Sequence, residues 1–172
     1  MGADKALLEL GGRTLLEHVA AELTAACSPV AIVGGSRQLP GIPLIADDIE
    51  SLGPAGGILT ALRHGSDWNL IVAVDMPAVT RGLLAEILSV AESKAGDCVL
   101  PVGRDGRVHP LCAAYHRRCL PVWEEAVAEG LRKVREIILR VRVVEMHPVR
   151  EELLRNVNTP AEWQDFLTHA AG

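Results

Sequence analysis

The stretch Asn69–Val79, with the sequence Asn-Leu-Ile-Val-Ala-Val-Asp-Met-Pro-Ala-Val, decides the fold. Its five consecutive apolar residues, Leu70 to Val74, predict a strand that is buried on both faces of a parallel sheet. Pro77 has no N–H for a strand ladder, so we expect the strand to stop at Asp75. Open α/β sheets bind ligands at the carboxyl ends of their strands. Asp75 is therefore a candidate ligand-binding carboxylate, with capping of a turn as the plainer alternative.

The rest of the chain alternates strands and helices around this stretch. Thr14 and Glu17 form a predicted capping box before an amphipathic helix, and Thr80 is the expected N-cap of a helix over 82–94. A hairpin-like turn is predicted at 103–107 and a final helix at 161–167. Further strands are predicted at 30–33, 42–45, 98–102 and 141–146, and an interrupted helix at 117–139. The pattern predicts one α/β domain over residues 1–172, with parallel strands in an open sheet.

Composition excludes several classes of partner. Aromatic residues make up only 3% of the 172 residues, so the stacking platforms of single-stranded nucleic-acid binders are not expected. The net charge of −5 gives no general attraction to nucleic acid or to an anionic membrane. A phosphate-bearing ligand would therefore need a local positive group or a metal ion.

The cysteines indicate a reducing compartment. Cys27, Cys98, Cys112 and Cys119 form no Cys-x-x-Cys pair and lie in mostly apolar surroundings, which favours buried free thiols over disulfides or a zinc site. No apolar run approaches the roughly 18 residues of a membrane span, and no signal peptide is apparent. We therefore expect a cytoplasmic location.

Three further patterns are each open to two interpretations. Lys5, in a glycine-containing loop, is either a phosphate ligand or a solvated surface lysine. The pair Asp47 and Asp48, after the strand at 42–45, is either ligand-binding or ordinary loop acidity. The stretch Gly53-Pro54-Ala55-Gly56-Gly57 precedes a predicted helix. Either its backbone amides bind an anion or a sugar, or its glycines only allow a tight turn.

Taken together, the motifs resemble those of the molybdenum cofactor guanylyltransferases, over essentially the whole chain. The Asn156-Val157-Asn158-Thr159-Pro160 ending is the most specific and favours a guanylyl over a cytidylyl enzyme. The other motifs, in the family's order, are Asp4-Lys5-Ala6-Leu7-Leu8, Gly53-Pro54-x-x-Gly57, Val74-Asp75-Met76-Pro77 and His109-Pro110-Leu111. The resemblance implies the Rossmann-like nucleotidyltransferase fold, a three-layer α/β/α arrangement with a mostly parallel sheet.

The resemblance also implies roles for individual residues. Lys5 would bind the triphosphate, and Asp75 would bind Mg²⁺; both would be catalytic. Asp47, or Asp48 if the alignment slips by one, would help to hold the guanine nucleotide. Gly34, Gly53 and Pro54 would complete the nucleotide site, with Gly34 in a place where some family members have asparagine. The pterin substrate would be received by His109, Asn156 and Asn158.

The implied reaction is the transfer of GMP from GTP to the molybdenum-molybdopterin cofactor, with release of pyrophosphate. Other molybdenum-cofactor biosynthesis proteins or apo-molybdoenzyme chaperones are implied as partners. The alternatives are a CTP-dependent molybdopterin cytidylyltransferase, a sugar-phosphate nucleotidyltransferase, and an inactive nucleotide-binding fragment. A serine hydrolase and a Walker-type NTPase are excluded by the lack of Gly-x-Ser-x-Gly and of Gly-x-x-x-x-Gly-Lys-Ser/Thr.

One departure from the family concerns the amino terminus. The family begins with a strand and a Leu-Ala-Gly-Gly-x-Ser-x-Arg-Met-Gly loop, of which only Met1-Gly2 is present. That strand lies in the middle of the family's sheet, so we expect two unpaired strand edges in this chain. The expectation is a fragment or a misassigned start codon.

Overall fold

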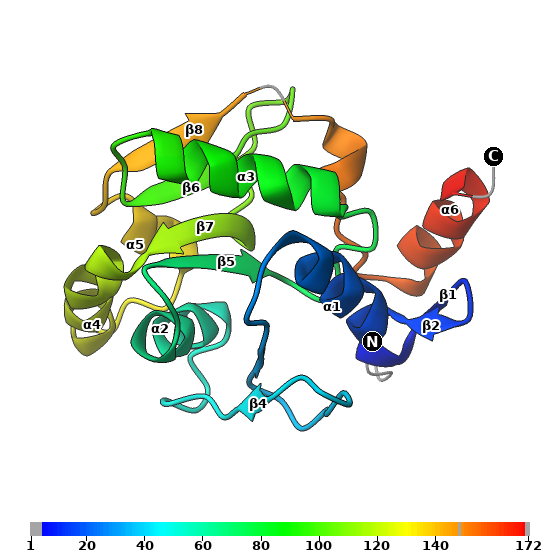
Figure 1. Cartoon of the computed structure of the whole chain (residues 1–172), viewed down its shortest axis with the longest axis horizontal. Helices are drawn as coiled ribbons and strands as arrows, with labels where there is room; N and C mark the ends of the chain where they lie inside the picture. Colours follow the sequence, from blue (N-terminus) through cyan, green and yellow to red (C-terminus); the bar gives the residue numbers. More distant parts are fainter. Residues whose placement is uncertain (1–4, 148, 171–172) are drawn as a thin grey trace.

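A computed structural model describes residues 5–147 and 149–170, and it has the predicted α/β fold (Figure 1). Within these residues the main sheet has four strands in the order β5–β7–β6–β8, and β3 pairs with β4 in a separate two-stranded sheet. The strands of the main sheet are β5 (Trp68–Val72), β6 (Cys98–Pro101), β7 (Cys112–His116) and β8 (Val143–Met146). The shorter strands are β1 (Glu9–Leu10), β2 (Arg13–Thr14), β3 (Ile32–Val33) and β4 (Leu44–Ile45).

The strand directions agree with a mostly parallel sheet interrupted by one reversed strand. β6 and β8 are parallel, and β7 is antiparallel to both β5 and β6, so β5, β6 and β8 run the same way. β7 is reversed because a hairpin turn joins it to β6. In this turn the Gly103 N–H donates to the Arg107 carbonyl at 3.0 Å, and Gly106 adopts φ +77°. The turn predicted at 103–107 is confirmed.

The helix starts follow their predicted capping residues. Thr14 Oγ1 accepts from the Glu17 N–H at 3.2 Å, and Glu17 Oε2 accepts from the Thr14 N–H at 2.8 Å, which completes the capping box. Thr80 Oγ1 accepts from the Leu83 N–H at 3.3 Å. The helices are α1 (Leu15–Ala26), α2 (Pro54–His64), α3 (Arg81–Ser93), α4 (Leu120–Ala128), α5 (Val134–Ile138) and α6 (Pro160–Ala170). Three short 3₁₀ segments are η1 (Lys5–Leu7), η2 (Arg117–Cys119) and η3 (Glu151–Leu154).

Helices cover both faces of the main sheet. Val99 and Ala114 contribute to a core cluster with α1 and α3, whereas Leu100 and Tyr115, one residue further along each strand, contribute to a cluster with α2, α4 and α5. This alternation is the pleat of a sheet that is buried on both sides. The three-layer arrangement is therefore confirmed. Among the described residues, no helix is long and apolar enough to cross a membrane.

The amino-terminal hairpin and the carboxyl-terminal helix pack together. Leu15 at the start of α1, Val157 and Trp163 of α6 are all buried in one small cluster. Figure 1 shows α6 beside β1 and β2. This packing fixes the path of the 155–159 segment, which runs from η3 into α6.

All four cysteines are free thiols, as predicted. Cys98, Cys112 and Cys119 are buried and Cys27 is half-buried. Burial disfavours the thiolate, which raises the pKa of Cys112 to about 12.

The environment of the 70–74 run differs from the prediction in one respect. We expected this strand to be buried on both faces and to end at Asp75, but β5 ends at Val72 and residues 70–74 are only half-buried. The reason is that β5 pairs with β7 on one side and forms the edge of its sheet on the other. Among the described residues, β5 and β3 each have one edge without a partner strand, in agreement with the expectation of unpaired strand edges.

Candidate active site

Asp75 lies in the turn after β5 and is held by the segment that precedes α6. The Val157 N–H donates to the Asp75 carbonyl at 2.8 Å, and Asn156 Nδ2 donates to Asp75 Oδ1 at 2.9 Å. The backbone bond positions the loop, and the side-chain bond orients the carboxylate. Asp75 therefore has a fixed direction before any ligand binds.

Four of the predicted residues meet in one hollow of about 240 Å³. Its lining includes Asp75, His109, Asn156 and Asn158. Arg107 lines it too, although the sequence analysis did not select this residue. Two motifs about 80 positions apart, Val74-Asp75-Met76-Pro77 and Asn156-Val157-Asn158, thus form one site together with the His109-Pro110 turn.

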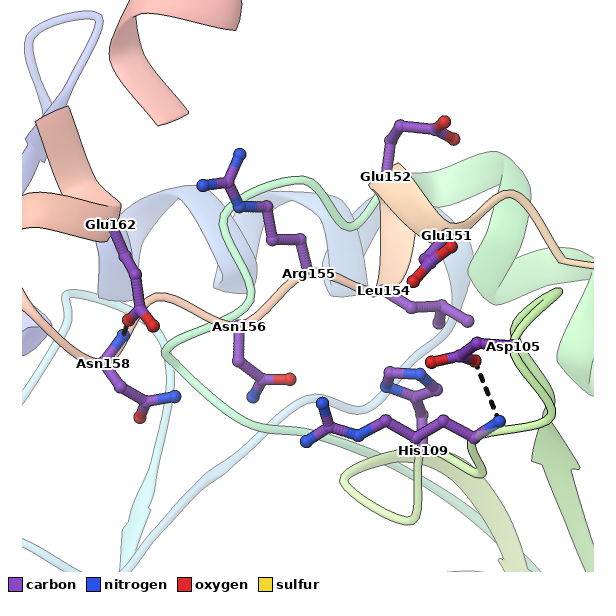
Figure 2. A pocket seen from close by; sticks show the side chains of 10 residues that line it. Asp105, His109, Glu151, Glu152, Leu154, Arg155, Asn156, Asn158 and Glu162 are labelled. Carbon is purple, nitrogen blue, oxygen red and sulfur yellow. Dashed lines mark hydrogen bonds between the residues drawn. The ribbon is translucent and has the colours of Figure 1, made fainter. Parts of the chain in front are cut away.

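A larger polar hollow of about 500 Å³ shares part of this lining. Figure 2 shows that its side chains come from two neighbouring segments, the turn with Asp105 and His109 and the stretch from Glu151 to Glu162. Arg107, His109, Asn156 and Asn158 line both hollows. The two hollows therefore form two parts of one cleft with Asp75 at one end.

His109 is buried at the boundary between the two parts. Its N–H donates to the Pro101 carbonyl at 3.1 Å, and its carbonyl accepts from the Cys112 N–H at 3.1 Å. Burial lowers the pKa of His109, and the positive charge of Arg107 lowers it further. The ring is therefore neutral near pH 7, when one nitrogen donates and the other accepts hydrogen bonds.

The charged groups of the larger hollow are not equally available to a ligand. Glu162 Oε2 accepts from the N–H groups of Asn158 and Thr159, and Arg155 is paired with Asp165. The Arg107 guanidinium makes no ion pair or hydrogen bond within the described part of the chain. Its backbone is held by the Asp105 carboxylate, which accepts from the Arg107 N–H at 2.9 Å. Arg107 thus has a fixed backbone and lines the cleft with its guanidinium. In the sequence, this residue could have been selected as the basic residue two positions before His109.

Asp47 has a buried carboxylate oxygen that lacks a partner. No described group hydrogen-bonds to Asp47 Oδ1. The carboxylate lies against Gly34, where a Cβ would be 2.6 Å from Asp47 Oδ2. Gly34 has φ +72°, and its N–H donates to the Ile45 carbonyl at 2.8 Å. Burying a polar atom without a hydrogen-bond partner costs free energy. Asp47 Oδ1 is therefore suited to accept a hydrogen bond from a bound ligand.

Asp48, by contrast, already has partners. Its carboxylate accepts from Arg63 Nη1 at 3.0 Å and contacts His64 Nε2 at 3.0 Å, and its N–H donates to Thr60. The hydrogen bond with His64, followed by that with Arg63, lowers the pKa of Asp48. The geometry thus favours Asp47 over Asp48 as the ligand-binding residue of the pair.

Gly53 and Pro54 do not line the cleft around Asp75. Gly53 adopts φ +58° as the residue before α2, and Pro54 occupies the first turn of that helix. The first turn of α2 contains no acidic residue, so its amides face no built-in negative charge. Lys5 begins η1, and its side chain lies outside what the structure describes.

The acidic groups of the cleft suit a metal ion that takes few protein ligands. Among the described residues, no cluster of three or more His, Cys, Asp or Glu side chains is placed to bind a metal ion. Mg²⁺ needs no such cluster, because it commonly takes one or two carboxylates together with phosphate oxygens and water. The carboxylate of Asp75, oriented by Asn156, is suited to bind Mg²⁺ in this way.

Comparisons with known proteins agree with this arrangement. A family model described as a MobA-like NTP transferase domain matches residues 1–146. The chain is 33% identical over 175 residues to the molybdenum cofactor guanylyltransferase of Photobacterium profundum, covering 96% of this chain and 87% of that protein. It is 32% identical to a probable molybdenum cofactor guanylyltransferase of Mycobacterium avium, with 94% and 86% covered. The solved structure of molybdopterin-guanine dinucleotide biosynthesis protein A from Archaeoglobus fulgidus has a TM-score of 0.84 at 24% identity, with 99% and 92% covered. The chain belongs to the family of MobA-like NTP transferases.

Proposed function

We propose that this protein transfers GMP from GTP to the molybdopterin cofactor and releases pyrophosphate. The relatives from Photobacterium profundum and Mycobacterium avium are named for this activity. The observation that carries the proposal is the bond from Asn156 to Asp75, because it joins the proposed acceptor loop to the proposed metal-binding carboxylate.

The transfer requires a phosphate oxygen of the acceptor to attack the α-phosphorus of GTP while pyrophosphate leaves. Such a reaction depends mainly on positioning the reactants and on neutralising charge. Asp75 would hold Mg²⁺, which when bound neutralises charge on the phosphates. Asn156 orients the Asp75 carboxylate through its hydrogen bond, and Lys5 would add positive charge at the triphosphate.

The acceptor would occupy the larger polar hollow. Its anionic phosphate suits the Arg107 guanidinium, which lines both parts of the cleft and lies near Asp75. The pterin ring carries N–H donors that suit carboxylates such as Asp105 and Glu151. Neutral His109 and the amide of Asn158 would supply the remaining polar contacts.

The guanine base would be read by Asp47. Guanine presents two adjacent donors, N1–H and the 2-amino group, and a carboxylate accepts both with its two oxygens. Asp47 Oδ1 is buried without a partner in the described structure, which supplies the acceptor. Cytosine lacks this pair of adjacent donors, so Asp47 supports GTP over CTP. The first-turn amides of α2, after Gly53 and Pro54, would contribute to the nucleotide site.

The free thiols support a place for this activity in the reducing cytoplasm. There, other molybdenum-cofactor biosynthesis proteins would supply the acceptor, and apo-molybdoenzyme chaperones would receive the product.

The test is pyrophosphate release from GTP or CTP with molybdopterin cofactor and Mg²⁺. We expect turnover with GTP, loss of turnover with a chelator, and recovery when Mg²⁺ is restored. Asp47→Asn should weaken GTP binding while Asp48→Asn, at the neighbouring carboxylate, does not. A preference for CTP would overturn the guanylyl assignment, and tight GTP binding without pyrophosphate release would select the non-catalytic alternative.

A further inference from the structure

Thr60, in α2, has a buried hydroxyl group to which the proposed reaction gives no role. The residue is 0% exposed, and its Oγ1 accepts a hydrogen bond from the Asp48 N–H at 3.0 Å. This N–H belongs to the planar peptide unit that joins Asp47 to Asp48. The bond to Thr60 therefore fixes the backbone directly after Asp47.

The segment that follows Asp48 packs closely on the same face of α2. Gly56 lies four residues before Thr60, so the two residues share one side of the helix. A Cβ at Gly56 would be 2.9 Å from the Cβ of Leu52 and 3.3 Å from the Ile49 carbonyl oxygen. The absence of a side chain at Gly56 thus lets the segment lie against the helix, where Thr60 can reach its backbone.

Arg63 and His64 continue this face of α2 and contact the Asp48 carboxylate, each at 3.0 Å. These contacts lie at the surface, where ion pairs contribute little to stability. An asparagine at position 48 would also keep one acceptor oxygen for them. The bond from Thr60 is different, because it holds a backbone N–H and does not depend on the side chain at position 48.

The Asp47 carboxylate is confined on its other side by the end of β3. The Gly34 N–H donates to the Ile45 carbonyl at 2.8 Å, and a Cβ at Gly34 would be 2.6 Å from Asp47 Oδ2. Asp47 Oδ1 is buried without a partner among the described residues. Asp47 thus lies between Gly34 and a peptide unit that Thr60 holds, so rotation of that peptide would move both carboxylate oxygens.

We propose that Thr60 is a positioning residue that determines how strictly the nucleotide site selects guanine. The inference rests on the proposed role of Asp47 in binding the base. A carboxylate distinguishes guanine from hypoxanthine only when its two oxygens reach N1–H and the 2-amino group together, since hypoxanthine has N1–H but lacks the amino group. Loss of the Thr60 bond would therefore weaken the binding of GTP more than that of ITP.

The position of Thr60 on α2 also connects the two proposed parts of the nucleotide site. The first turn of this helix, after Gly53 and Pro54, carries the amides proposed for the phosphates, and Thr60 lies in the same helix. A helix is a rigid spacer of 1.5 Å per residue. The distance between the base-binding carboxylate and the phosphate-binding amides would thus be set by α2.

The experiment measures the affinities of GTP and ITP by calorimetric titration, with Mg²⁺ and without the acceptor, so that no turnover is needed. We expect the unmodified chain to bind GTP about tenfold or more tightly than ITP. Thr60→Val, which keeps the size of the side chain but removes the acceptor, should lower this ratio to about threefold or less. It should also speed amide exchange at Asp48 by about tenfold. Thr60→Ser, which keeps the hydroxyl, should preserve both values.

Thr24→Val is the matched control. Thr24 Oγ1 donates to the Ala20 carbonyl within α1 at 2.7 Å, and its loss should leave the ratio of GTP to ITP affinity unchanged. Thr60→Ala also removes the acceptor and adds no methyl group beside the Asp48 amide. It replaces Thr60→Val if that variant does not fold, and the same decrease of the ratio is expected.

Two results would overturn this inference alone. One is an unchanged ratio in Thr60→Val or Thr60→Ala although the Asp48 amide exchanges faster, and the other is an equal loss of GTP and ITP affinity, which would show a structural role only. A chain without mutations that binds GTP and ITP equally would contradict the role of Asp47 itself, and with it both the proposed reading of guanine and this inference.

Discussion

Asn156 Nδ2 donates a 2.9 Å hydrogen bond to Asp75 Oδ1 although the two residues are 81 positions apart. The neighbouring backbone bond from Val157 to the Asp75 carbonyl, at 2.8 Å, fixes the same two segments. The turn after β5 and the loop before α6 therefore act as one unit. A carboxylate held in this way needs little reorganisation when it binds a charged ligand.

Asp75→Asn should abolish Mg²⁺-dependent pyrophosphate release and leave the thermal midpoint close to that of the unmodified chain. The amide keeps the size of the side chain but removes the charge that would bind the metal. Asn156→Ala should lower kcat by about 10–100-fold because it removes the group that orients the carboxylate. Asp67→Asn, an exposed carboxylate before the start of β5, is the matched control and should leave kcat unchanged. Full activity of Asp75→Asn would remove Asp75 from the reaction.

Gly34→Ala should impair GTP binding far more than Gly35→Ala. Both glycines have positive φ, +72° and +67°, so both substitutions carry a backbone cost of about 1–2 kcal/mol. Only the Cβ at position 34 would meet the Asp47 carboxylate, at 2.6 Å, while nothing lies within 4 Å of one at position 35. Calorimetric titration with GTP measures the difference. Equal affinities in the two variants would contradict a role for the carboxylate of Asp47 in binding the base.

Arg107→Gln should raise KM for the pterin acceptor and leave KM for GTP nearly unchanged. The guanidinium lines both parts of the cleft and has no partner among the described residues, so its loss removes charge from the acceptor side. Arg104→Gln changes an exposed arginine of the same turn that lines neither hollow, and it should have no effect. Steady-state kinetics with each substrate varied in turn distinguishes a shift in acceptor binding from a general loss of activity.

The free energy of unfolding should decrease on acidification, in part because of His109. Burial and the charge of Arg107 lower the pKa of His109 in the folded protein, so the unfolded state binds the proton more tightly. This contribution is fully present above the unfolded pKa of about 6.5 and is lost as the pH falls through the lower folded pKa. Urea denaturation between pH 8 and pH 5 should show a shallower decrease for His109→Gln. His116, whose pKa is also lowered by burial, accounts for a remaining slope. Parallel curves for the two proteins would rule out the assigned role of His109.

Thiol titration of the native protein should modify Cys27 well before the other cysteines. Cys112 and Cys119 are buried, with pKa values raised to about 12 by burial, so their reactive thiolates are scarce at pH 8. Cys27 is only half-buried at the end of α1. All four should react once the chain is unfolded in denaturant. Simultaneous reaction of four thiols in the native state would contradict the buried environment.

Much of the local structure could be predicted from the sequence, because it depends on neighbours. The Thr14–Glu17 capping box, the start of α3 after Thr80 and the glycine turn at 103–107 form where their residue types are spaced as each motif requires. The apolar runs located β5, β6 and β8 to within a few residues, but no strand was predicted at β7. The motifs that resemble a known family also named Asp75, His109, Asn156 and Asn158, which the fold brings into one hollow.

The sequence by itself thus determined the α/β class, the starts of α1 and α3, the turn at 103–107, and the polar groups that follow the strands. Only the tertiary structure decided how those groups meet. It placed Asn156 in hydrogen-bond contact with Asp75 and gave Asp48 partners, while one oxygen of Asp47 has none among the described residues. It also placed Arg107 in the lining of both hollows. It also put β5 at an edge, although its composition is that of an interior strand. The physical reason is range: caps and turns form between residues a few positions apart, whereas partners and burial depend on segments that packing brings together from distant parts of the chain.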